Sequence, residues 1–160
     1  MKYLISLLLA GLLAYGAWPY YQVYRLDDVL GNDDLRGLSE LVDLESIRKN
    51  TGQRFSSGVK QLTPGASQSE ALAWLNEQLK RLGDAALEQA ISLQWVMDTL
   101  RQAATRHSDR PTPYFISAID WAFFDALDGF LIRLGPIGES PVHVRMSLQD
   151  RNWRVTDIIR

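Results

Sequence analysis

The hydrophobic residues of this chain are most concentrated at its start, in a run that ends where the first acidic charges appear. No ionised side chain occurs from Tyr3 to Tyr24, and Lys2 and Arg25 stand on either side of the run. A helix needs roughly 20 apolar residues to cross a bilayer. The pattern therefore predicts that residues 1–24 form a helix that spans a membrane, or a signal that carries the chain across one.

These two interpretations of the apolar run remain open. A secretory signal combines a basic start, an apolar centre of about 7–15 residues and small residues before the cleavage site. Residues 4–13 followed by Ala14-Tyr15-Gly16 fit this pattern, with cleavage before Ala17. A retained anchor would instead place Trp18 and the tyrosines after it in the headgroup layer, where aromatic rings accumulate. We favour the anchor.

The charges beside the apolar run predict its orientation. Basic residues stay on the cytoplasmic side of a membrane. Lys2 precedes the run, whereas Arg25 after it is outnumbered by Asp27 and Asp28. We therefore expect residues 25–160 to form a single domain outside the cytoplasm.

Between the apolar run and residue 106, hydrophobic residues recur at the three- and four-residue spacing of amphipathic helices. The expected helices cover residues 20–30, 34–42, 44–61, 68–82 and 85–106, and the first of them continues from the apolar run. Their boundaries carry capping residues: Asp33 and Asp43 as N-caps, Ser67 with Glu70 as a capping box, and Gly31-Asn32 and Gly83 as C-caps. An interruption is expected at Ser92, and two prolines make residues 107–113 a connector.

From residue 114 the hydrophobic period shortens to two, the period of a half-buried strand. Strands are expected at residues 130–134, 142–149 and 153–159, separated by turns at 135–138 and 150–152. Residues 119–127 are either a fourth strand or a helical turn. Helices followed by an antiparallel sheet of three or four strands define an α+β fold. Trp153 and Val155 are expected to face its core.

The composition excludes several classes of function. A net charge of −2 and a pI near 5.7 offer no basic surface for nucleic acid. The absence of cysteine removes disulfides, thiol nucleophiles and cysteine-bound zinc. His107 and His143 are the two histidines, and neither has a partner at metal-ligand spacing. Serine-hydrolase and phosphate-loop motifs do not occur, so we assign no catalytic residue, metal or cofactor.

Arg133, Arg145 and Arg154, together with His143, form the candidate ligand-binding site. Each arginine alternates with the apolar residues of its own strand, so neighbouring strands bring all three to one face of the sheet. Guanidinium groups suit phosphate and carboxylate, which makes an anionic ligand or a lipid headgroup the expected occupant. The alternative is that these long side chains only keep a sheet face soluble.

Four aspartates offer an acid–base alternative, and they stand near strand ends and turns: Asp120, Asp125, Asp128 and Asp157. Two carboxyl groups that meet with separated pKa values would act as a general acid and a general base. Aspartates at such positions more often stabilise turns and strand ends, and we favour that role.

Short segments from both ends of the chain carry a resemblance to a known family: residues 19–26, 34–43 with Ile47-Arg48, 129–133, Val144-Arg145 and 153–158. They resemble domain-of-unknown-function family 2939, and the resemblance is weak over residues 53–113. It implies a single-pass inner-membrane protein with a periplasmic domain, and an aspartate–arginine pair opening the third helix. More loosely, the arrangement resembles the NTF2-like, cystatin-like roll, a fold that hosts enzymes, ligand binders and assembly modules alike.

The function expected from the sequence is non-enzymatic binding of a protein partner or small ligand by a membrane-anchored domain. The alternative is a small enzyme using Asp, Tyr and Arg side chains in the pocket of a roll. An enclosed cavity with converging ionisable groups favours the enzyme. A filled interior with an exposed apolar patch favours the interaction protein.

Overall fold

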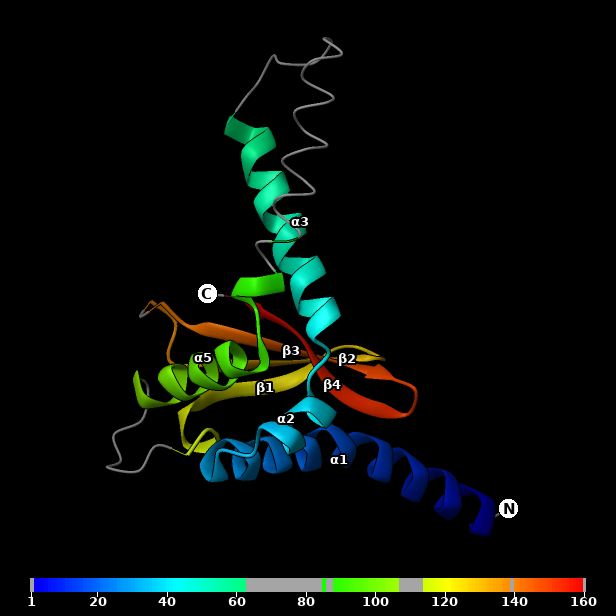
Figure 1. The fold of residues 1–160 in the computed structure, drawn as a ribbon. Coiled ribbons are helices and arrows are strands. Elements are labelled where there is room, and N and C mark those ends of the chain that lie inside the picture. Colours follow the sequence, from blue (N-terminus) through cyan, green and yellow to red (C-terminus); the bar gives the residue numbers. More distant parts are fainter. Residues whose placement is uncertain (1, 63–84, 86–87, 107–113, 139, 160) are drawn as a thin grey trace.

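The α+β fold is confirmed, with the helices preceding the sheet in the chain (Figure 1). The structure is a computed structural model, and it describes residues 2–62, 85, 88–106, 114–138 and 140–159. The helices in these ranges are α1 (Lys2–Asn32), α2 (Leu35–Leu41), α3 (Leu44–Leu62) and α5 (Leu93–Arg106), with the 3-10 turn η1 (Ile116–Ala118). The strands are β1 (Ile119–Ala126), β2 (Gly129–Leu134), β3 (Val142–Gln149) and β4 (Asn152–Ile159).

These elements agree closely with the expected ones. Residues 20–30 continue the apolar helix, as expected, within the single helix α1, and residues 119–126 of the ambiguous segment form a strand. The interruption at Ser92 is confirmed, because helical residues 88–90 end before it and α5 begins after it. Three expected features lie outside the described residues: the helix at 68–82, its capping box at Ser67 and Glu70, and the connector at 107–113.

The four strands form an antiparallel meander in the order β1-β2-β3-β4. Leu127-Asp128 joins β1 to β2 and Asp150-Arg151 joins β3 to β4, so both hairpin tips lie at the same end of the sheet. The φ angles of Asp150 and Arg151 are 47° and 67°. Two consecutive positive φ angles give a tight turn whose twist matches that of the strands. The β2–β3 connection lies at the opposite end.

The hydrophobic core lies between one face of the sheet and the helices α1, α2 and α5. Along β2, every second side chain is fully buried, and these are Phe130, Ile132 and Leu134. This alternation is what the pleat of a strand with one covered face requires. In Figure 1, α1 and α2 run along one side of the sheet, whereas α3 leaves the β4 edge and extends away from it.

The inward orientation predicted for Trp153 is confirmed. Its side chain is 1% exposed, and it pairs with Leu148 while Val155 pairs with Met146. The indole packs edge-on against the ring of Phe124, with centroids 5.8 Å apart. Aromatic pairs in this arrangement add to the stabilisation that comes from burial alone.

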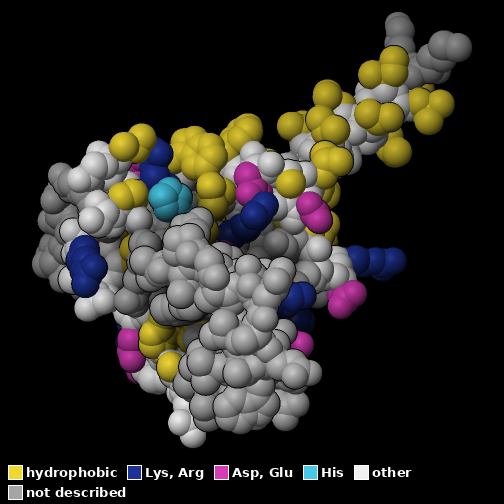
Figure 2. Space-filling view, turned by 90° about the horizontal axis from the view of Figure 1, so that it is seen from above, with side chains coloured by type: hydrophobic (Ala, Val, Ile, Leu, Met, Phe, Trp, Pro, Cys, Tyr) yellow, Lys and Arg dark blue, Asp and Glu magenta, His cyan; other side chains and the backbone are white. Residues whose placement is uncertain are grey.

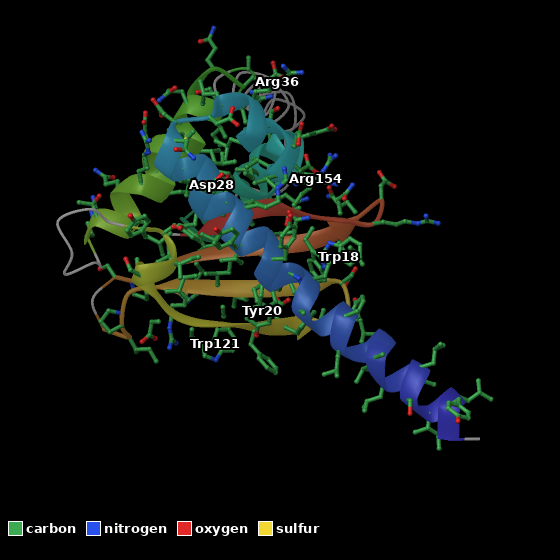
Figure 3. The ribbon with its side chains drawn as sticks, turned by 90° about the horizontal axis from the view of Figure 1, so that it is seen from below. Trp18, Tyr20, Asp28, Arg36, Trp121 and Arg154 are labelled. Atoms are coloured by element: carbon green, nitrogen blue, oxygen red, sulfur yellow. The ribbon has the colours of Figure 1, made fainter. Side chains whose placement is uncertain are left out.

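Helix α1 is continuous over 31 residues, but its two halves have different surroundings. Side chains of residues 3–14 are exposed, whereas Val23, Leu26 and Leu30 are buried in the core. Pro19 lies inside the helix without ending it. Proline lacks the N–H that a helix interior uses, so the junction between the halves has one hydrogen bond fewer. Figure 3 shows the first half projecting beyond the domain.

The end of α1 corrects the expected caps. Asp33, with a φ of 58°, takes the left-handed conformation instead of the expected Gly31-Asn32. The N–H of Asp34 then donates to the carbonyl of Val29 at 3.1 Å, which closes the helix as a Schellman motif. Because α1 runs further than expected, Asp34 rather than Asp33 is the N-cap of α2. Aspartate adopts the left-handed conformation more readily than most residues.

The predicted N-cap of α3, Asp43, is confirmed. Its Oδ1 accepts the main-chain N–H of Ser46 at 3.0 Å, and its Oδ2 accepts the Ser46 hydroxyl at 2.6 Å. The side-chain amide of Gln149 donates to the same Oδ2 at 2.9 Å. The N–H of Asp43 donates to the carbonyl of Val155, beside an isolated bridge from Val42 to β4. This single residue therefore attaches the start of α3 to two strands.

Two arginines hold the ends of other helices. Arg48, from the aspartate–arginine pair at the start of α3, donates to the carbonyls of Glu88 and Ile91 at 3.1 and 3.0 Å. Arg101 of α5 donates to the carbonyl of Leu30 at 2.8 Å. The last carbonyls of a helix lack internal partners and carry partial negative charge, so guanidinium groups stabilise them.

Removal of the Trp153 side chain should unfold the domain or leave it insoluble. Loss of a buried tryptophan side chain typically costs about 3–5 kcal/mol, a large share of the roughly 5–15 kcal/mol that stabilises a domain. Arg154→Ala is the matched control, because the side chain points to the other face and should contribute less than about 0.5 kcal/mol. Urea unfolding measures both variants. Equal losses would mean that the register of β4 is shifted by one residue.

Asp43→Ala should lower the free energy of unfolding by about 1 kcal/mol, the usual contribution of an N-cap. Asp43→Ser should restore most of this loss, because a serine hydroxyl accepts the same N–H of Ser46. Thermal unfolding compares the two. A serine variant as unstable as the alanine variant would show that the contact with Gln149, rather than the cap, carries the stabilisation.

The stability should also depend on pH through Asp43. Burial raises the pKa of this carboxyl, but the hydrogen bonds from Ser46, Gln149 and the N–H of Glu45 outweigh burial and lower it. A carboxyl group with a lowered folded-state pKa adds stability above its unfolded-state pKa, and this stability is lost as pH falls through the folded-state value. The unfolding free energies of the natural chain and Asp43→Asn should therefore converge in acid. A constant difference between neutral and acidic pH would contradict this.

Candidate functional site

The four predicted site residues share one face of the sheet, opposite the core. In the β2–β3 register, Arg133 pairs directly with His143. Arg145 follows on the same face of β3, and Arg154 of β4 pairs with Ser147, the next residue of that face. We call this surface the outer face, and its members are Trp121, Phe123, Leu131, Arg133, His143, Arg145, Ser147 and Arg154.

Two β-bulges in β1 decide which charges meet these arginines. The β1–β2 register shifts near both ends of β1, and the extra residues at the two shifts are Asp120 and Asp125. A bulge leaves its extra residue out of the pairing and re-aims the side chain. Both aspartates consequently reach the arginines of the neighbouring strands.

The resulting ion pairs use two of the three site arginines. Nε of Arg133 donates to Oδ2 of Asp120 at 3.0 Å, and a second nitrogen of the same guanidinium donates to that oxygen as well. A terminal nitrogen of Arg145 lies 2.7 Å from Oδ2 of Asp125. These contacts neutralise much of the positive charge that an anionic ligand would need.

Gly129 makes room for the second ion pair. A β-carbon at this position would collide with the carboxylate of Asp125, and it would also crowd the side chain of Ala126. The glycine at the start of β2 is therefore required by the close approach of Asp125.

A third bulge, in β4, places polar groups on the same face. The register with β3 shifts after Arg145, and the extra residue is Thr156, whose hydroxyl lies 3.0 Å from that of Ser147. The next residue, Asp157, is buried and pairs with Arg54 of α3. This carboxylate therefore attaches α3 to the edge of the sheet instead of facing a ligand.

Arg154 differs from the other two site arginines. Within the part of the chain that the structure describes, no carboxylate pairs with it, and its Nε is buried without a hydrogen-bond partner. A buried donor without a partner costs free energy. Among the three site arginines, Arg154 is therefore the one whose charge is not neutralised by a described carboxylate.

Exposed aromatic side chains accompany the charges on the outer face. Trp121 is 42% exposed and Phe123 56% exposed, and their ring centroids lie 6.2 Å apart. Figure 2 views the molecule from this side and shows hydrophobic and basic side chains next to a histidine. Tryptophan and arginine are the residues most enriched among those that dominate the affinity of protein interfaces.

The outer face is better suited to binding than to acid–base chemistry. Its carboxylates, Asp120 and Asp125, each bind an arginine, and Asp128 lies in the β1–β2 turn, where its carbonyl accepts the N–H of Leu148 at 2.8 Å. Among the described residues, no group of three or more His, Cys, Asp and Glu side chains is placed to hold a metal ion.

Sequence reasoning placed the arginines but missed their partners. The alternation within β2, β3 and β4 was enough to bring Arg133, Arg145 and Arg154 to one face. The pairing of Asp120 and Asp125 with these arginines was not predicted, because a bulge cannot be recognised from strict alternation. The available signal was that each aspartate interrupts the alternation of large side chains in β1.

Gly129→Ala should destabilise the domain by about 1–2 kcal/mol, as overpacking of a well-fitted position does. The same substitution should cost less when Asp125 is already alanine, because the colliding carboxylate is then absent. A double-mutant cycle measured by urea unfolding isolates this coupling. Equal costs in the two backgrounds would contradict the predicted contact.

Comparison with known families extends the resemblance through the middle of the chain. The sequence model of the family described as "Protein of unknown function (DUF2939)" matches residues 8–99, more than half of the chain. The match begins in the apolar half of α1, continues into α5 and ends before β1. No curated protein matches the chain, and no solved structure does. The NTF2-like, cystatin-like resemblance stays a prediction.

Proposed function

The chain belongs to the DUF2939 family of proteins of unknown function, and we propose that it is a membrane-anchored binding domain. The apolar run within residues 1–24 holds it in the inner membrane as a single span, and the folded domain, which begins with the second half of α1 and continues to residue 160, lies in the periplasm. The domain binds a protein partner through its outer face and performs no catalysis.

The continuity of α1 is the observation that carries the anchor. Among the described residues, one helix is long and apolar enough to cross a membrane, and it lies at the N-terminus, where a signal sequence would pass the same test. The helix continues without a break past Ala17, the residue that cleavage would expose. Before that point, the Tyr15 ring stacks on Phe124, with centroids 6.1 Å apart. Cleavage would remove this contact, which supports retention of the segment.

The charges at the two ends of the span support the periplasmic orientation. Lys2 precedes the apolar run, and Asp27 and Asp28 follow it. Oδ1 of Asp27 accepts the N–H of Ile116 at 3.1 Å, so this carboxylate is part of the folded domain. The acidic end of the span is therefore on the same side of the membrane as the domain.

Binding of a protein is favoured over binding of a small anion or catalysis. The interior between helices and sheet is filled by buried hydrophobic side chains, which favours an interaction protein over an enzyme. Two site arginines are already paired with aspartates, while Trp121 and Phe123 remain exposed beside them. A partner with an apolar surface and a carboxylate for Arg154 would fit this face.

The protein should remain in the membrane fraction after a carbonate wash, because a spanning helix is not released by disrupting ionic contacts. N-terminal sequencing of the membrane-bound product should read from the start of the chain. A soluble product that begins at Ala17 would overturn the anchor and leave a protein secreted to the periplasm.

Crosslinking in the same membrane fraction tests whether the outer face binds a protein. A photo-crosslinking residue at Phe123 should form an adduct with a defined protein, and Trp121→Ala should abolish that adduct without changing thermal stability. A crosslinker at Ile137, 79% exposed in the β2–β3 connection, is the matched control and should give no adduct. Identical patterns at the two positions would contradict a specific interface on the outer face.

A further inference from the structure

The β1–β2 hairpin tip is fastened to α1 at a point where the helix should still be inside the membrane. The hydroxyl of Tyr15 donates to the carbonyl of Leu127, the first residue of the hairpin turn. Five residues later, the hydroxyl of Tyr20 donates to the carbonyl of Ala122 at 3.2 Å. Figure 3 shows Tyr20 where α1 crosses the sheet, and the rest of the helix continuing beyond it. The hairpin thus lies alongside α1 from Tyr15 onward.

The exposed aromatic residues of α1 mark the level of the membrane surface. Trp18, Tyr21 and Tyr24 remain exposed although the helix around them is docked on the domain. They recur every three residues, so they lie along one side of the helix. Tryptophan and tyrosine prefer the interface between hydrocarbon and water. These side chains put the membrane surface beyond Tyr15.

We propose that the domain rests directly on the bilayer and inserts Leu127 into the lipid interface. The inference rests on the proposed anchor and adds a second point of membrane contact. Leu127 is 86% exposed at the tip of the hairpin that Tyr15 fastens to α1, so its side chain is free to enter the lipid. The β3–β4 turn lies at the same end of the sheet, and its Arg151 is exposed. Its guanidinium would face the phosphates of the headgroup layer.

The natural absence of cysteine makes a direct test available. The full chain is reconstituted into vesicles of phosphatidylcholine and phosphatidylglycerol with one introduced cysteine, labelled with an environment-sensitive fluorophore. The variants are Leu127→Cys, Ile137→Cys at the opposite end of the sheet, and Leu8→Cys in the free half of α1. All three positions are exposed, so the labels leave the core intact. Lipids that carry a nitroxide near the headgroup or deep in the acyl chain report the depth of each label.

The label at Leu127 should be quenched by the shallow nitroxide at least about twofold more than the label at Ile137, as expected for insertion to interfacial depth. The label at Leu8 should respond to the deep nitroxide. Quenching at Leu8, with equal responses at Leu127 and Ile137, would overturn this inference and leave the anchor standing. No quenching at Leu8 would overturn the anchor, and the inference with it.

Discussion

The whole structure depends on helix α1, whose first half is exposed and whose second half is buried in the core of the domain. The second half of α1 supplies Val23, Leu26 and Leu30 to the core, so the domain cannot complete its fold without it. The first half is apolar and exposed, and it belongs to a helix long and apolar enough to cross a membrane or to act as a signal sequence. Because the two halves form one helix, the orientation of the domain is fixed relative to its apolar segment. A flexible linker would allow free rotation between the two, and here no such linker intervenes.

On the outer face, the aspartates of β1 neutralise the arginines of β2 and β3. Arginines at alternate positions of β2 and β3 would repel each other if left alone, and the bulges of β1 bring Asp120 and Asp125 to them. Exposed ion pairs contribute little to stability, so their main effect is on recognition. They remove net charge from the face and leave geometry, aromatic rings and Arg154 to select what binds there.

Much of the fold could be predicted from the sequence because periodicity reports burial directly. The alternation of Val144 and Met146 with polar neighbours fixed both the strand and its inward face, and the cap at Asp43 located the start of α3. The end of α1 was harder, because Asp33 and Asp34 are adjacent and chemically alike. Only the position of the last helical turn decides which of them caps the next helix.

The pairing of the candidate site could not be predicted, because it depends on contacts between strands. Strict alternation assumes one residue for one residue across a ladder, and three register shifts break that assumption. The continuation of the first helix past Pro19 was expected from the sequence. Burial of the residues after Pro19 and the contacts of Tyr15 and Tyr20 hold this helix together.

The bulges of β1 also decide how copies of this protein behave toward each other. A meander has two open edges, and an unpaired strand edge is a template for pairing with another chain. The β4 edge is met by the bridge from Val42 and by α3. β1 is the other edge, and its two bulges distort the row of backbone groups that a second strand would need. Under the proposed anchoring, copies would share one plane and one orientation, so they would meet side by side far more often than free copies. The irregular edge would then oppose the extension of one sheet by another.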